Sequence, residues 1–324
     1  VKTSSGKLKL KVGHIQITDH LPLGMLKHMI ETKELEPRHF ELETVCMPGW
    51  NPVQAAVETG EIDGAFVLAP IAMDLFGFDV PVKLIMLSHK GGSICVRNKR
   101  LVESVADPSN IHDFFLDRAV LVPHKMSVHI MLAHEFLSEH GLKPGFPGRK
   151  DAINVRFEIV PPVKMPEFMA QNDRVAAFIV AEPIGSKAIA SGVAEKLFLS
   201  NERWDDHPCC VMAIRKETVD AHRDAIHEFS NMLVRAGDEI RFNPVRASQV
   251  AVSFLDPKGV LGLKAEVLHK VLTAEMGIRT SDLYPELDDL DRIQRYMYHN
   301  MDIGELINLE QFVDLEFAKY ACGM

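Results

Sequence analysis

The chain has 324 residues, of which 47% are hydrophobic and 25% charged, and its formal net charge at pH 7 is -9. This length suffices for two domains of ordinary size, each with its own apolar core. Binding to nucleic acid is disfavoured, because it depends on an excess of Lys and Arg, and the longest apolar runs are far shorter than the roughly 20 residues of a membrane helix.

The first predicted elements form a strand, a loop and a helix. Residues 8–17 are rich in β-formers, a polar loop with Pro22 follows, and residues 23–30 have helical apolar spacing. The same order recurs with a strand at 119–122, a loop at 123–127 and a helix at 128–140. This similarity predicts that the chain contains two related halves.

A second pattern also occurs twice. Residues 55–70 and residues 167–183 each read as a short helix, a polar turn and an apolar strand that ends at a proline. Together the two duplications predict an α/β protein of two lobes, each with a doubly wound sheet. This arrangement resembles the type II periplasmic-binding-protein fold, the venus flytrap.

Two β-rich runs are expected to cross between the lobes. They are residues 84–96, interrupted by Gly91 and Gly92, and residues 210–215. We therefore predict that lobe one comprises residues 1–90 and 216–324, and that lobe two comprises residues 91–215. Two crossovers form a hinge, which permits the lobes to close.

Ligands of open α/β sheets bind at the carboxyl ends of the strands. We therefore nominate residues in the loops that follow predicted strands as the ligand-binding set. From lobe one the set comprises Thr18, Asp19, His20, Gly49, Trp50, Ala69, Pro70 and His89, and from lobe two Lys125, Met126, Ser127, His129, Pro162, Glu182 and Pro183.

Several of these residues have a simpler interpretation. Ser127 precedes a helix, so it either helps to bind polar oxygens or only caps the helix. Trp50 either stacks on a ligand or packs beneath its own loop. Asp19 and Glu182 are pocket residues in one interpretation and surface carboxylates in the other.

Metal, cofactor and catalytic motifs are not recognisable. Several histidines fall in the nominated loops, but His124 and His129 lack the spacing of helical metal ligands, and there is no HExxH, Walker or GxSxG motif. The five cysteines are odd in number and show no CxxC spacing. We interpret Cys209 and Cys210 as strand neighbours that face opposite sides, and we expect no cofactor and no catalytic residue.

At these positions the chain resembles the nitrate/sulfonate/bicarbonate group of ABC-transporter substrate-binding proteins. The resemblance runs from about residue 10 to at least residue 215. It rests on GHIQITDHLP at 13–22, Gly49-Trp50, GEIDGAFVLAP at 60–70, MSVH at 126–129, Pro161-Pro162 with Met165, Ala181-Glu182-Pro183 and Asp206-His207-Pro208. In the nitrate and bicarbonate binders, the positions that match Trp50, Ser127 and His129 line the pocket.

The resemblance leaves the ligand open. The position of Glu182 is acidic in bicarbonate binders and basic in nitrate binders, and a carboxylate beside nitrate is repulsive, which disfavours nitrate. Lys125 and Met126 depart from the usual loop, and the helical tail after Glu217 is more similar to that of the sulfonate, taurine and pyrimidine-precursor binders.

The resemblance further implies a monomer that delivers a small molecule to ABC membrane subunits. It implies a periplasmic or extracellular membrane-anchored location, with a leader removed before Val1. The alternatives are an enzyme on the same fold, of the thiamine-pyrimidine or menaquinone-pathway type, or a ligand-sensing domain. The synthases use a PLP-holding lysine and a cysteine-rich stretch, which Cys209-Cys210 matches poorly.

Overall fold

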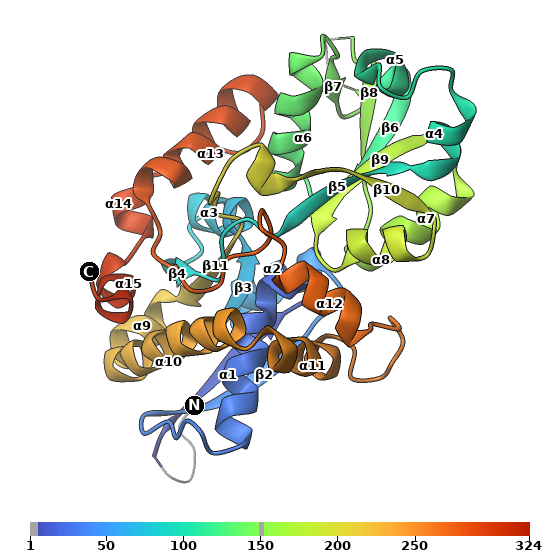
Figure 1. The fold of residues 1–324 in the computed structure, drawn as a ribbon. Coiled ribbons are helices and arrows are strands. Elements are labelled where there is room, and N and C mark those ends of the chain that lie inside the picture. The colour runs from blue at the N-terminus through green and yellow to red at the C-terminus, as the bar shows by residue number, and fades with distance from the viewer. Residues whose placement is uncertain (1–5, 149–151) are drawn as a thin grey trace.

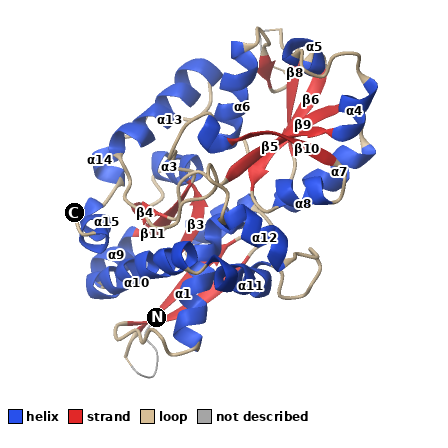
Figure 2. Ribbon diagram, in the orientation of Figure 1, coloured by secondary structure: helices blue, strands red, loops and turns tan. Residues whose placement is uncertain are grey.

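Two sheets, each with helices on both faces, build two lobes (Figure 1, Figure 2). The computed structural model describes residues 6–148 and 152–324. The predicted two-lobed α/β fold is confirmed. Within these residues, no helix combines the length and the apolar character that crossing a bilayer requires.

The first sheet is formed mainly from the N-terminal part of the chain. Its strands lie in the order β2 (Phe40–Cys46), β1 (Leu8–His14), β3 (Gly64–Leu68), β11 (Cys210–Arg215) and β4 (Val82–Leu87). Strand β1 pairs in parallel with β2 and β3, whereas β11 is antiparallel to both β3 and β4. Every residue of β3 is buried, because helices cover both faces of the sheet.

The second sheet repeats this plan. Its strands lie in the order β10 (Ala194–Leu199), β5 (Ser93–Asn98), β9 (Val175–Ala181), β6 (Arg118–Val122), β8 (Val155–Ile159) and β7 (Pro144–Gly145). Strand β6 is parallel to β8 and β9, and β5 is antiparallel to β9 and β10. In each sheet, therefore, a strand that follows a crossover is inserted antiparallel between two others. In the first sheet β11 lies between β3 and β4, and in the second β5 lies between β9 and β10.

The helices that follow the strands begin where the sequence provides helix-starting residues. Pro22 lies in the first turn of α1 (Leu21–Glu31) and Pro70 in that of α3 (Ala69–Gly77), where the missing N–H costs nothing. Helix α2 (Trp50–Thr59) ends at Gly60, whose φ of 74° is left-handed. In the second lobe the corresponding helices are α6 (Val128–Glu139), α7 (Met165–Gln171) and α8 (Ile184–Ala190).

The other helices are short connections or belong to the C-terminal part of the chain. The connections are η1 (Thr18–His20), α4 (Lys99–Ser104), α5 (Ile111–Phe115), η2 (Pro162–Lys164) and η3 (Ser200–Glu202). The C-terminal helices are α9 (Lys216–Ala221), α10 (Arg223–Phe242), α11 (Pro244–Leu255), α12 (Ala265–Leu272), α13 (Leu287–Met301), α14 (Leu309–Phe312) and α15 (Leu315–Cys322).

Two segments lie elsewhere than their assigned lobe. Strand β11, which the predicted range 91–215 placed in lobe two, is hydrogen-bonded within the first sheet, so the second crossover ends before Cys210. Helix α13, which we assigned to lobe one, buries Ile293, Met297 and Met301 in a core cluster of the second lobe. Helix α13 therefore packs against α6 of the second lobe, beside which it lies in Figure 1, and it also contacts α3 of the first lobe.

Gly91 and Gly92 carry the chain across the first crossover with φ values of 62° and 84°. A Cβ atom on Gly91 would lie 2.2 Å from the side chain of Asn201, and one on Gly92 would lie 2.9 Å from Ile278. Both the backbone conformation and the close packing require glycine at this point.

Candidate functional site

Strand-end loops of the two lobes meet in direct hydrogen bonds. The backbone N and the Oγ1 of Thr18, which follows β1, both donate to the carbonyl oxygen of Glu182, which follows β9, at 2.7 and 2.8 Å. His124, in the loop after β6, lies with its Nε2 3.2 Å from Oδ1 of Asn51 in α2. The loops after β1, β6 and β9, which were nominated from the sequence, therefore take part in an interface between the lobes.

Most of the nominated residues are buried. Those with little or no exposed surface are Thr18, Asp19, His20, Trp50, Ala69, Pro70, His89, Ser127, His129, Pro162, Glu182 and Pro183. Gly49 and Met126 are half-buried, whereas Lys125 is exposed. Trp50 does not sit in a loop as predicted, because it is the first residue of α2.

The His20 side chain is a neutral hydrogen-bond donor. Its Nδ1 accepts the backbone N–H of Ile15 at 2.9 Å, so the ring proton must be on Nε2. Burial lowers the pKa of His20 well below 6.5, which keeps the ring neutral at pH 7. The Nε2 atom is buried and has no hydrogen-bond partner.

Trp50 provides a second donor beside His20. The two rings contact each other edge to face, with their centroids 5.7 Å apart. The indole Nε1 is buried and has no hydrogen-bond partner. Because an unpaired buried N–H is costly, two adjacent unpaired donors indicate a place for a ligand with acceptor oxygens.

Two histidines near the second lobe also have one unpartnered nitrogen each. Nε2 of His129, in the first turn of α6, lies 2.9 Å from Oγ of Ser93, and its Nδ1 is unpartnered. Nδ1 of His207 lies 3.2 Å from the carbonyl of Pro208, so this nitrogen carries the proton and the unpartnered Nε2 is an acceptor. Burial lowers the pKa of His129 to about 3 and that of His207 to about 4.

Glu182 is a buried carboxyl group. Burial raises its pKa to about 7, although hydrogen bonds from the backbone N and the Oγ of Ser186, at 2.9 and 2.6 Å, partly oppose this shift. The charge of Asp19 raises the pKa of Glu182 further. The group is therefore partly protonated at neutral pH.

Ser127 does not offer a free polar group to the interface. The Ser127 hydroxyl donates to the carbonyl of His124 at 2.9 Å and accepts the N–H of Ile130 at 3.2 Å, as expected for a helix cap. The simpler of the two interpretations of Ser127 thus accounts for both of its hydrogen bonds.

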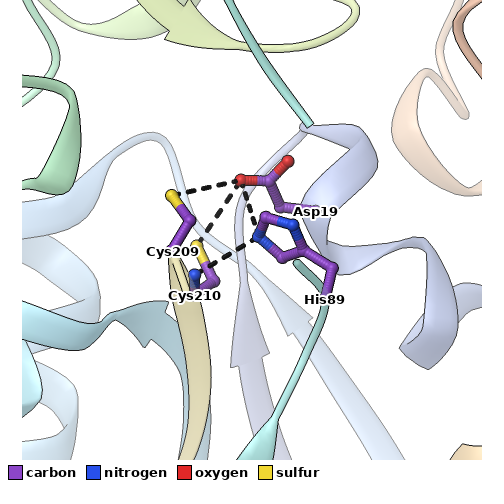
Figure 3. Close-up of side chains that lie close together, drawn as sticks. All are labelled: Asp19, His89, Cys209 and Cys210. Carbon is purple, nitrogen blue, oxygen red and sulfur yellow. Dashed lines mark hydrogen bonds and ion pairs between the residues drawn. The ribbon is translucent and has the colours of Figure 1, made fainter. Parts of the chain in front are cut away.

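Asp19, His89, Cys209 and Cys210 form a compact buried cluster (Figure 3). Oδ2 of Asp19 lies 3.0 Å from Nε2 of His89, 3.7 Å from Sγ of Cys210 and 3.9 Å from Sγ of Cys209. The interpretation that the two cysteines face opposite sides is wrong, because both thiols point to the same carboxylate. Cys209 precedes β11, so the alternation of a pleated strand does not apply to it.

The charges in this cluster are strongly coupled. Burial opposes a charge on His89, but the Asp19 carboxylate outweighs it and raises the pKa of His89 to about 10. Burial raises the pKa of the Cys210 thiol well above 9, while its hydrogen bond with Cys209 lowers the pKa of the Cys209 thiol. In the described part of the chain, this cluster is the group of side chains with the geometry to hold a metal ion.

Sequence reasoning missed Cys209, Cys210, His207, Ser93 and Ser186. Asp206-His207-Pro208 is one of the landmarks of the family resemblance, which gave a signal for His207. Adjacent cysteines directly after this landmark were the signal for the cluster, but their partners are more than a hundred residues away in the sequence.

The model of the NMT1-like family matches residues 4–253. The chain belongs to the NMT1-like family. Among curated proteins it is similar to the nitrate import ATP-binding protein NrtC of Synechocystis, with 25% identity over 227 residues, which cover 67% of this chain and 32% of that protein. The chain spans about a third of the length of the curated relatives it matches.

Solved structures confirm the fold. The ligand-binding component of an ABC-type import system from Staphylococcus aureus, determined with zinc bound, has a TM-score of 0.82 and 21% identity, covering 97% of this chain and 99% of that one. The periplasmic nitrate-binding protein NrtA from Synechocystis has a TM-score of 0.83 and 17% identity, covering 98% of this chain and 89% of that one. The resemblance to nitrate/sulfonate/bicarbonate-type binding proteins is thus confirmed in family and fold.

Proposed function

We propose that this protein is an extracytoplasmic solute-binding protein of an ABC importer, which holds a small anionic ligand between its two lobes. The observation that carries the proposal is the set of buried, unpartnered polar atoms on His20, Trp50, His129 and His207. These residues come from both sides of an interface that Thr18 and Glu182 hold together. Relatives named for nitrate and bicarbonate import support it.

The donors favour an anion of low charge. His20 Nε2 and Trp50 Nε1 are neutral donors, the exposed Lys125 cannot neutralise a buried anion, and Lys90 is paired with Asp282 at 2.6 Å. A ligand with both acceptor oxygens and a hydroxyl would also satisfy the acceptor Nε2 of His207. Bicarbonate has this combination, and a sulfonate has the acceptors alone, so we place bicarbonate first.

Closure of the lobes would couple binding to transport. The bonds from Thr18 to Glu182 form only when the two loops are together, and a ligand that joins both lobes would stabilise that state. The membrane subunits of the importer would then recognise the closed monomer outside the cytoplasm. We infer binding rather than catalysis, since the unpartnered atoms of His20, Trp50, His129 and His207 belong to an indole and to neutral imidazoles, which can exchange hydrogen bonds with a ligand.

Calorimetry and thermal-shift measurements with bicarbonate, nitrate and ethanesulfonate test the proposal. Trp50→Phe keeps the aromatic ring and removes the donor, so it should weaken binding about five- to tenfold, the equivalent of one hydrogen bond of about 1–1.5 kcal/mol. Trp204→Phe, which changes the other tryptophan, is the matched control and should leave the affinity unchanged. The proposal fails if none of these anions binds, or if Trp50→Phe and Trp204→Phe bind them equally well.

A further inference from the structure

The cluster of Asp19, His89, Cys209 and Cys210 is built entirely by the first lobe. Asp19 lies in η1 after β1, and His89 follows β4. Cys209 and Cys210 lie at the start of β11, where Cys210 pairs with Leu68 at the end of β3. All four side chains thus reach the same edge of one sheet, and their arrangement does not depend on lobe closure.

The separations within the cluster match those between the ligands of a tetrahedral ion. With metal–ligand bonds of about 2.0–2.3 Å, neighbouring ligand atoms are about 3.4 Å apart for N and O and about 3.6–3.8 Å apart when sulfur is included. The observed distances from Asp19 Oδ2 are 3.0 Å to His89 and 3.7 and 3.9 Å to the two sulfurs. All four ligand atoms lie within 4.8 Å of one another, so small side-chain rotations would complete the shell.

Hydrogen bonding alone does not satisfy this cluster. The side chains of His89, Cys209 and Cys210 approach Oδ2 of Asp19, and the backbone N–H of Cys210 lies 3.3 Å from Nε2 of His89. Oδ1 of Asp19 and Nδ1 of His89 are buried without a partner. The side chains of Asp19 and His89 have no exposed surface. Burying a carboxylate oxygen and an imidazole nitrogen without partners is costly, so the contacts within the cluster leave it incomplete.

We propose that Asp19, His89, Cys209 and Cys210 bind one divalent cation of the zinc class. Two thiolates, an imidazole and a carboxylate suit a thiophilic ion of tetrahedral preference and exclude Mg²⁺ and Ca²⁺, which take oxygen ligands. The two thiol protons and the proton on the ligating nitrogen of His89 leave to solvent when the ion binds. Four protein ligands leave no open position, so the ion is held and does not activate water.

Cobalt reports directly on this coordination. Metal-free protein, prepared by unfolding in chelator and refolding, is titrated with Co²⁺ and then with Zn²⁺. One equivalent of Co²⁺ should give the visible bands of a tetrahedral ion together with a thiolate-to-cobalt charge-transfer band. Zinc should remove both signals and raise the melting temperature, because it binds the folded state more tightly than the unfolded chain. Absence of the charge-transfer band in the wild-type protein overturns the proposal.

Substitutions of three of the four proposed metal-binding residues test which side chains bind the ion. Cys209→Ser and Cys210→Ser should each reduce the charge-transfer band, and Asp19→Asn, which preserves shape, should weaken zinc binding more than about tenfold. Cys95→Ser removes another buried thiol, one that lies in the core of the second lobe, and should bind cobalt normally. An unchanged cobalt spectrum in both Cys209→Ser and Cys210→Ser contradicts the assignment, and if these variants do not fold, the wild-type titration and Asp19→Asn still decide it.

This inference stands independently of the proposed function. Trp50→Phe, which should weaken anion binding, should bind cobalt as the wild type does. Anion binding without a thiolate–cobalt signal would refute the metal site alone, whereas a cobalt signal without any bound anion would refute the proposed ligand alone.

Discussion

The buried carboxyl group of Glu182 should make the stability of the protein depend on pH in a defined direction. Its pKa is raised from 4.5 to about 7 in the folded protein. At about 1.4 kcal/mol per pH unit, this difference corresponds to about 3 kcal/mol. Below pH 4.5 the group is protonated in both states, so its contribution is intact there. As the pH rises to 7, the unfolded chain ionises first and the folded state loses this contribution.

Glu182→Gln cannot ionise, so the comparison with wild type isolates the effect from the titration of other groups. We expect the free energy of unfolding of Glu182→Gln, minus that of wild type, to rise by about 3 kcal/mol between pH 4.5 and 7.5. Urea denaturation of ligand-free protein at several pH values measures the difference. Glu61→Gln, at an exposed position, should give a flat difference. A flat difference for Glu182→Gln as well would show that this carboxyl group is not shifted.

Three further predictions concern closure, packing and acid stability. Thr18→Val removes the hydroxyl bond to the Glu182 carbonyl, about 1 kcal/mol, so X-ray scattering of the ligand-bound protein should show a more open population, and an unchanged profile would argue against this latch. Gly237→Ala would place a Cβ 1.9 Å from the carbonyl oxygen of Thr280, so we expect a loss of about 1–3 kcal/mol in urea denaturation, and full stability would refute the close approach. Burial keeps several histidines neutral, so the unfolded chain takes up protons first as the pH falls below 6.5. The free energy of unfolding measured by urea denaturation should therefore drop between pH 7 and pH 5 by about 2 kcal/mol for each of His14, His129 and His207. His129→Gln should reduce that drop, and equal drops in variant and wild type would contradict the shifted pKa.

The sequence was sufficient for the architecture because its signals are local and repeated. A strand, a loop and a helix each leave a pattern within about ten residues, and two copies of the pattern predicted two lobes. The partners of a strand in its sheet, and of a helix in its packing, can be far away in the sequence. The apolar run of β11 looks the same in either sheet, and the stripe of α13 shows which face is buried but not what covers it.

The candidate site was predictable to the same extent. The nomination of His20, Trp50 and Glu182 rested on the rule that ligands bind at the ends of strands, which needs only the order of the elements, and the structure buries all three. The metal cluster did not follow, because Asp19, His89 and Cys209 are separated by long stretches of sequence and each is unremarkable alone. Only the fold brings them together.

The insertion of β11 between β3 and β4 also affects how the protein is made. The second sheet uses strands from one continuous stretch, residues 93–199, whereas the centre of the first sheet stays incomplete until residue 215 has left the ribosome. The lobe that begins the chain should therefore be the last to acquire its native core, and a fragment ending at residue 90 should be prone to aggregation through its unfilled strand edges. The longest exposure to misfolding thus falls on the N-terminal segment.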